Sequence, residues 1–193
     1  SLGNDQQSVE KYIKDCKENI LKTPSYEESI GYSIFLEKAK VIEDAIHTFD
    51  KNYILNRTLI GTAPLGFINA QTIYNPTDRK YIIVFDQGLF VFALLLSKTV
   101  ALALPLKNDP VNVSFSTDKQ DIINHIKADP KAVIRFRELL NAYIFEGDPS
   151  RAPRYAIEFP RDRPTSAYMN AFELFVIGHE YGHTLIRDEK IPA

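Results

Sequence analysis

The stretch "FELFVIGHEYGHTLIRDEK", residues 172–190, places two histidines four positions apart in a segment rich in apolar residues. Residues four apart lie one turn apart on the same face of an α-helix. The apolar residues before the histidines predict a central, buried helix, which we expect to begin near Thr165 or Ser166 and to end near residue 187. His179 and His183 would then direct their imidazole rings to one point beside this helix.

This spacing has a chemical consequence, because two imidazole nitrogens on one helix face can bind the same zinc ion at distances of about 2.0–2.1 Å. Glu180 follows the first histidine, so its carboxylate can reach a water molecule on the metal without binding the metal itself. Zinc lowers the pKa of such a water toward about 7. We expect His179 and His183 to be metal ligands, and Glu180 to be the general base that later gives the proton to a leaving amine.

The alternative is an ordinary helix that contains two histidines by chance. The chain has four histidines, and with so few this pattern arises by chance in well under about one such sequence in a hundred. His47 and His125 lie on segments that are predicted to be polar, amphipathic helices. We therefore expect both of these to be exposed, and neither to bind metal.

The composition favours one domain and argues against some partners. The chain has 193 residues, 45% of them hydrophobic, which is enough for one sizeable core. A net charge of -2 does not favour nucleic acid as a partner. The single cysteine, Cys16, cannot form an internal disulfide, and we expect it to pack rather than to react. The first residues show no secretory signal pattern, so the expected location is cytoplasmic.

One apolar stretch, "LFVFALLLSKTVALALPL" at residues 89–106, has a length near the lower limit of a membrane span. Lys98 lies near its middle, where a charge would be costly inside a bilayer. Asp86 and Gln87 bound the stretch on one side and Lys107 on the other. We therefore expect a helix buried in a protein core, and do not favour a membrane span.

The whole pattern predicts an α+β fold, mostly helical with a small β-sheet or hairpin. Apolar residues at helical spacing predict helices at residues 7–22, 24–50, 88–104, 118–128, 130–145 and 165–187. The turn "NPTD" joins residues 67–74 to the apolar run of residues 80–85, which predicts a hairpin. We expect a single domain over residues 1–193, with N-terminal helices in 1–50, the sheet and its core helix in 53–106, further helices in 117–146 and the histidine helix in 165–188.

Two polar regions are expected to face solvent. The helix of residues 24–50 alternates apolar residues with charged ones, so that one face would be wet, with Glu37, Lys38, Lys40, Glu43 and Asp44 on it. The segment of residues 147–165 holds four arginines among several prolines. It is predicted to be an irregular surface loop, and a loop that lines a substrate site is the alternative.

With these residues in view, the sequence resembles the zincins, the zinc peptidases with a His-Glu-x-x-His motif. It is most similar to minimal gluzincins, such as the group that contains the CAAX-prenyl and heat-shock membrane proteases. The segment "ELFVIGHEYGHTL" carries the specific part of the resemblance, and "FINAQTIYNPTDRKYIIVFDQGLFVF", residues 67–92, is similar to that group's Asn-Ala strand, hairpin strand and Gly-Leu helix start. The resemblance implies a zincin-like fold in which the hairpin lies beside the motif helix and its edge strand can hold an extended substrate.

The third metal ligand departs from the family pattern. Gluzincins take it, usually a glutamate, from a helix well beyond the second histidine, whereas this chain continues only to Ala193. Asp188 and Glu189 follow the motif, but a continuing helix would carry both away from the metal. We therefore expect that the C-terminal part of the domain is not represented. We also expect that two histidines alone hold zinc weakly, since a catalytic site normally has three protein ligands.

The resemblance implies a zinc metallopeptidase that hydrolyses protein or peptide substrates, with His179 and His183 as ligands and Glu180 as the base. One alternative is a catalytically inactive zincin-like module with a regulatory or binding role, in a stress response or in phage defence. Another alternative is a plain structural domain with no metal.

Overall fold

A computed structural model of the chain describes residues 30–49, 58–63, 65, 68–77, 79–107 and 114–186. The described elements are α2 (Ile30–Phe49), β1 (Thr58–Ala63), β2 (Ala70–Asn75), β3 (Lys80–Asp86), α3 (Gln87–Ala103), β4 (Leu106–Lys107), β5 (Ser114–Phe115), α4 (Lys119–Ala128), α5 (Lys131–Glu146), the short 3₁₀ helix η3 (Pro149–Arg151) and α6 (Asp162–Ile186). The α+β class and the small sheet expected from the sequence are confirmed.

The chain divides into two compact units, and the boundaries between them fall inside α3 and α6. The sheet unit comprises the described residues up to Leu89 and those from Glu173 onward, and the helical unit comprises Phe90–Phe172. The organisation as a single zincin-like domain stays a prediction. The predicted helix at residues 7–22, with Cys16, lies outside the described residues, as do Asp188 and Glu189.

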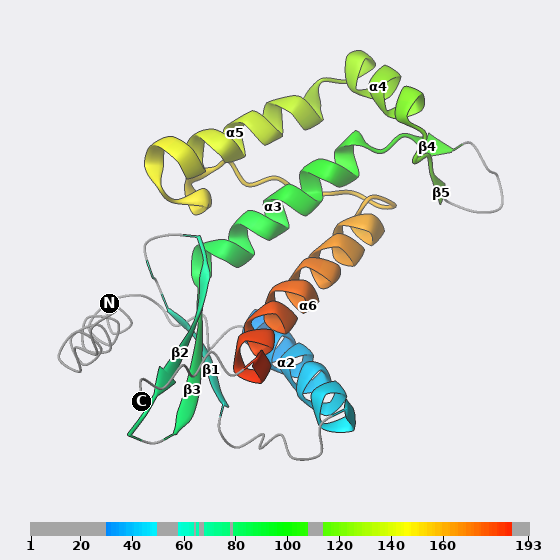
Figure 1. Cartoon of the computed structure of the whole chain (residues 1–193). Coiled ribbons are helices and arrows are strands. Elements are labelled where there is room, and N and C mark those ends of the chain that lie inside the picture. Colours follow the sequence, from blue (N-terminus) through cyan, green and yellow to red (C-terminus); the bar gives the residue numbers. More distant parts are fainter. Residues whose placement is uncertain are drawn as a thin grey trace. The chain divides into compact units, whose positions relative to one another are not determined.

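The sheet unit is built on three strands in the order β1-β3-β2 (Figure 1). The central strand, β3, pairs in parallel with β1 and antiparallel with β2, so the predicted hairpin is confirmed. Alternate residues of β3 point to opposite faces. Ile83 and Phe85 on one face are fully buried, whereas Ile82 and Val84 on the other are half-buried. The apolar run of residues 80–85 is therefore the centre of the sheet, and only one of its faces is fully buried.

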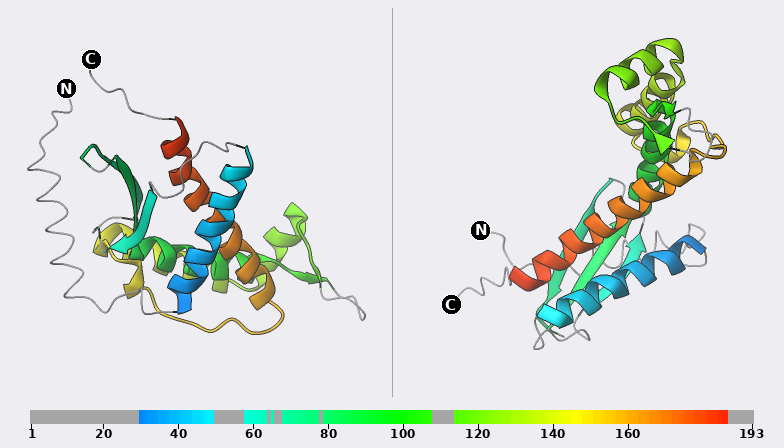
Figure 2. Two further views of the ribbon diagram at one scale, coloured as in Figure 1. Left: turned by 90° about the horizontal axis from the view of Figure 1, so that it is seen from below. Right: turned by 90° about the vertical axis from the view of Figure 1, so that its right-hand side faces the viewer.

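Two helices cover one face of this sheet. In the views of Figures 1 and 2, α2 and the part of α6 after Glu173 lie on the same side of the strands. Phe35 of α2 contacts Phe85 of β3 edge to face, with ring centroids 5.0 Å apart. In α6, Ile177 and Tyr181 are fully buried. The C-terminal part of the motif helix is therefore packed between a helix and a strand.

Two charged residues of α2 do not lie where the sequence predicts. Lys38 and Glu43 were expected on a wet face, but both are half-buried and contact α6. Lys38 forms an ion pair with Glu173, and the hydroxyl of Tyr181 donates a hydrogen bond to Oε1 of Glu43 at 2.5 Å. The prediction is wrong for these two residues because α6 turns polar groups toward α2, and a buried polar group needs a partner. The predicted end of the helix near residue 50 agrees with the observed end at Phe49.

The helix α3 begins directly where β3 ends, at Asp86. This side chain is only 6% exposed, and its two carboxylate oxygens accept hydrogen bonds of 2.7 Å from the backbone amides of Leu65 and Gly88. These bonds satisfy a free amide at the start of the helix and compensate the buried charge. The apolar helix predicted at residues 88–104 is thereby confirmed. None of the described helices is both long and apolar enough to cross a membrane.

The helical unit contains α4 and α5 near their predicted positions, with a small core of Leu95, Leu139, Ala142 and Ala152. Asp129 lies between the two helices, and its carboxylate accepts a hydrogen bond from the amide of Lys131 at 3.1 Å. The helix α5 ends at Gly147, which has a left-handed backbone with φ of 69°. Glycine adopts this conformation at little cost, so the end of the helix follows from the sequence.

The predictions for residues 147–165 are wrong in two places. Arg161 is not on a solvated surface, because its guanidinium donates hydrogen bonds to the carbonyls of Ala101 and Leu104 at 2.6 and 2.5 Å. The last carbonyls of a helix need donors, and here Arg161 supplies them to α3. The motif helix begins at Asp162 rather than near Thr165. The Thr165 hydroxyl bonds back to the carbonyl of Arg161 at 2.8 Å, so Thr165 lies within the first turn and is not its cap.

Candidate metal centre

Contacts on two sides of α6 set the rotation of this helix about its axis, and this rotation determines where the candidate site lies. The contacts of Glu173 and Tyr181 with α2 hold one side of the helix. On another side, the hydroxyl of Thr72 in β2 donates to Oε2 of Glu180 at 2.7 Å and lies 3.1 Å from the carbonyl oxygen of the same residue. With these sides packed, His179 remains exposed and His183 half-buried. The sequence predicted a buried helix, but its histidines lie on the open side.

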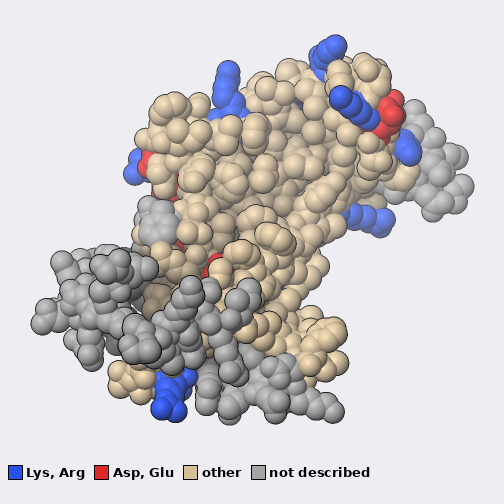
Figure 3. Space-filling view, viewed as in Figure 1, with Lys and Arg blue, Asp and Glu red and all other residues tan. Residues whose placement is uncertain are grey.

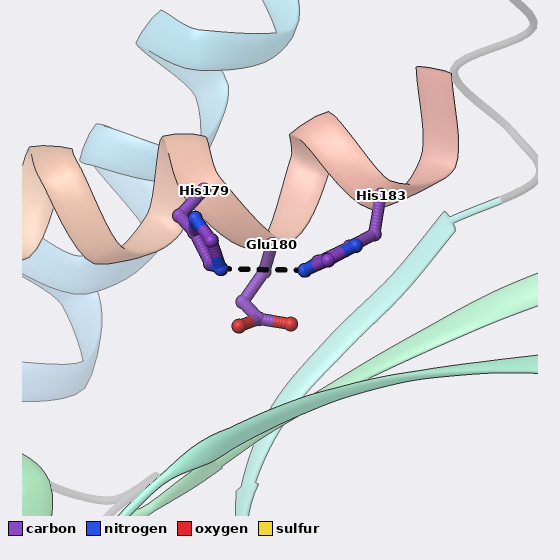
Figure 4. Close-up of side chains that lie close together, drawn as sticks. All are labelled: His179, Glu180 and His183. Carbon is purple, nitrogen blue, oxygen red and sulfur yellow. Dashed lines mark hydrogen bonds between the residues drawn. The ribbon is translucent and has the colours of Figure 1, made fainter. Parts of the chain in front are cut away.

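The two histidines point their Nε2 atoms toward each other. These atoms are 3.3 Å apart, the rings are perpendicular and the ring centroids lie 4.9 Å apart (Figure 4). Two nitrogens that bind one zinc tetrahedrally, at about 2.0–2.1 Å each, are about 3.3–3.4 Å from each other. The separation in this structure therefore matches that of two ligands of one tetrahedral ion.

Glu180 completes the group. One ligand atom from each of His179, Glu180 and His183 lies within 4.8 Å of the others. Figure 4 shows all three side chains projecting from the same stretch of α6, with the Glu180 carboxylate directed toward the sheet. Glu180 is only 6% exposed. The structure thus brings together the three residues that the sequence singles out, and their roles as ligands and base stay predictions.

The open side of the helix carries an aromatic ring and a glycine. Phe175, one turn before His179, is 72% exposed and stacks on the His179 ring with centroids 6.3 Å apart. A side-chain carbon added at Gly182 would meet nothing within 4 Å, whereas one at Gly178 would lie 3.6 Å from the side chain of Ile42. Of these two glycines, only Gly178 has a neighbouring element close to it among the described residues.

Two residues of the site were missed from the sequence. Thr72 alternates with Gln71 and Ile73 along β2, so its side chain lies on the core-facing side of the strand. A polar residue at such a position was the sequence signal that could have identified it. Phe175 lies four residues before His179, and this spacing on a helix predicts contact between the two rings. Neither signal says which partner the residue has, because that depends on how strand and helix pack.

The other histidines take no part in the group. His47 is exposed, as expected. His125 is half-buried rather than exposed, with Nε2 3.1 Å from the carbonyl oxygen of Leu102 and 3.5 Å from the guanidinium of Arg161. The expectation of exposure is wrong for His125 because its ring contacts the last carbonyls of α3. Among the described residues, no further histidine, cysteine or carboxylate belongs to the candidate metal group.

No family model, no curated protein and no solved structure matches the chain. The zincin resemblance stays a proposal, and its support is the motif with the geometry of the site. On the face shown in Figure 3, the visible basic side chains of the described residues are dispersed and form no continuous patch. That nucleic acid is not a partner stays a prediction from the net charge.

Proposed function

We propose that the chain is a zinc metallopeptidase that hydrolyses peptide bonds. The observation that carries the proposal is the 3.3 Å separation of the Nε2 atoms of His179 and His183, with a carboxylate oxygen of Glu180 within 4.8 Å of the same group. Two imidazoles and a neighbouring carboxylate are the residue types that a hydrolytic zinc site uses.

The residues have distinct roles in this proposal. His179 and His183 hold the ion, which when bound lowers the pKa of a water molecule and polarises the carbonyl of the peptide. Glu180 takes a proton from the attacking water and passes it to the leaving nitrogen. Because its carboxylate is nearly buried, it is kept in place and shielded from bulk solvent. With Glu180 as the base, the described metal group contains two protein ligands, His179 and His183.

The fold supports a peptide as the substrate. Among the described strands, β2 pairs only with β3 and lies at the edge of the sheet, and Thr72 ties this strand to the motif helix. An edge strand can bind an extended peptide through backbone hydrogen bonds, which are the same for most sequences. The proposal therefore includes a zincin-like architecture and a protein or peptide substrate, in a cytoplasmic protein as the sequence predicts.

A second function is kept because, with Glu180 assigned as the base, the described metal group supplies only two ligands, His179 and His183. A module that binds a partner through the same scaffold, without catalysis, needs no complete zinc site. In a stress response or in phage defence, such a module would act through binding alone.

The test is hydrolysis of fluorescein-labelled casein by the zinc-loaded chain and by its Glu180→Gln variant, with bound zinc measured in both. Glu37→Gln is the matched control, since Glu37 is exposed on α2 of the same unit. A general base contributes about 10²–10⁴-fold, so Glu180→Gln should lose that much activity and keep its zinc. Equal cleavage by both proteins would reject Glu180 as the base.

Two further outcomes separate the alternatives. If Glu180→Gln loses zinc together with activity, Glu180 is a ligand and the assignment of a base is wrong. If the wild-type chain binds zinc stoichiometrically but cleaves no casein, the binding module is favoured over the peptidase.

A further inference from the structure

We propose that Thr72 is the positioning residue for Glu180, so that a strand of the sheet sets the orientation of the general base. This inference rests on the proposed function, in which Glu180 acts on the attacking water. Thr72 touches no candidate metal ligand in the described contacts, and it would act only through the carboxylate that it binds.

The contact is specific in its geometry. The Thr72 hydroxyl is 2.7 Å from Oε2 of Glu180, which is the usual distance of an O–H···O hydrogen bond. The same hydroxyl lies 3.1 Å from the backbone carbonyl of Glu180, so a single side chain contacts both parts of that residue. These residues are 108 positions apart in the sequence, and their contact joins β2 to α6.

A buried carboxylate needs such a partner. Glu180 is 6% exposed, and burial of an unpaired polar group is costly. Within the described part of the chain, the Thr72 hydroxyl donates a hydrogen bond to the Glu180 carboxylate. This bond to Oε2 leaves the Oε1 oxygen available to accept a proton from water. The hydroxyl thus fixes a flexible side chain in the one orientation that the reaction uses.

A neighbouring threonine provides a matched control. Thr62 of β1 lies on the same face of the sheet, because it pairs with Phe85 while Thr72 pairs with Ile83, two residues away on β3. The Thr62 hydroxyl is buried without a hydrogen-bond partner in the described structure. Threonine-to-valine changes at the two positions therefore remove the same group on the same face of the sheet, but only one of them removes a bond to Glu180.

The first experiment needs no metal and no substrate. Unfolding by urea in the presence of EDTA is measured for the full chain with Thr72→Val, Glu180→Ala and both changes together. We expect Thr72→Val to reduce the folding equilibrium constant about 10-fold more in the wild-type background than in Glu180→Ala. The backbone carbonyl persists in Glu180→Ala, so this coupling reports the side-chain bond. Thr62→Val combined with Glu180→Ala should show no coupling.

The second experiment measures kcat and KM for fluorescein-labelled casein with zinc-loaded proteins. We expect Thr72→Val to lower kcat about 10- to 100-fold, since hydrogen bonds to charged groups are the stronger class, and to leave KM within about 2-fold. Thr72→Ser keeps the hydroxyl and should restore most of kcat. Thr62→Val should leave kcat unchanged.

Each result decides a separate statement. Additive effects in the unfolding cycle would overturn the contact itself. Coupling in that cycle, but with Thr72→Ser as slow as Thr72→Val, or with the loss confined to KM, would overturn the positioning role and assign Thr72 to packing or to substrate binding. A wild-type chain that holds zinc and does not cleave casein would reject the proposed function, and with it any catalytic role of Thr72, whatever the cycle shows.

Discussion

Removing the negative charge of Glu173 tests whether the contact between α2 and the motif helix is as stabilising as its burial indicates. The side chains of Lys38 and Glu173 are 14% and 7% exposed and form an ion pair. Burial lowers the pKa of the Lys38 ammonium, so this charge is costly where it stands. Glu173→Gln leaves that charge in place without its counter-ion.

The expected cost follows from this burial. Breaking one partner of a buried pair destabilises by about 3–5 kcal/mol. The Lys38 chain is long and keeps some exposure, so its ammonium can turn toward water, and we expect a cost just below that range, about 2–3 kcal/mol. Replacing both residues, as Lys38→Met with Glu173→Leu, removes both charges and keeps apolar volume. The double variant should therefore lie within about 1 kcal/mol of the wild type.

Urea unfolding followed by circular dichroism measures these free energies, with Glu138→Gln as the control. Glu138 pairs with Arg135 at 2.8 Å, but the two side chains are 29% and 32% exposed. Such a pair contributes less than about 1 kcal/mol. If Glu173→Gln cost no more than Glu138→Gln, or if the double variant were less stable than either single variant, the buried ion pair would not be what fixes α6 against α2.

Three smaller changes follow from other contacts. Tyr181→Phe removes the donor to Glu43 and should cost about 1–3 kcal/mol in urea unfolding; an unchanged midpoint would show that the 2.5 Å bond contributes nothing. Gly182→Ala places a carbon in open space and should stabilise the helix by about 0.5–1 kcal/mol, so a lower melting temperature would show a contact that the geometry lacks. Burial raises the pKa of the Tyr155 hydroxyl above its ordinary value. The protonated hydroxyl therefore contributes to stability below a pH of about 10, and this contribution is lost as the pH rises through the raised pKa. Tyr155→Phe should therefore weaken the alkaline fall in stability, and an identical pH profile would contradict this.

Local patterns predicted the elements of the site. The spacing of His179 and His183 on a helix is fixed by its 3.6-residue turn, so their proximity needed no knowledge of the rest of the fold. The hairpin followed from a turn with Asn75 and Pro76 between two apolar runs. The run of β3 predicted a buried strand, and it became the centre of the sheet.

The partners of these elements could not be predicted in the same way. Thr72 and Glu180 are 108 residues apart, and Lys38 and Glu173 are 135 apart. Such pairs depend on how helices and strands rotate as they pack, and many rotations bury similar apolar area. This is why Lys38 was expected in solvent. A helix with an apolar face shows which side is buried, but not which charged residues at its border find partners in the neighbouring element.

Isothermal titration calorimetry of zinc into the metal-free chain tests whether His179 and His183 form a metal centre. We expect one saturable zinc ion per chain, and we expect its binding to be lost in His179→Ala and in His183→Ala. Binding should be retained in His47→Ala, because His47 is exposed on α2, and in His125→Ala, because that ring contacts α3. Absence of saturable binding by the wild type, or equal binding by the His179 and His183 variants, would contradict the assignment of the metal centre.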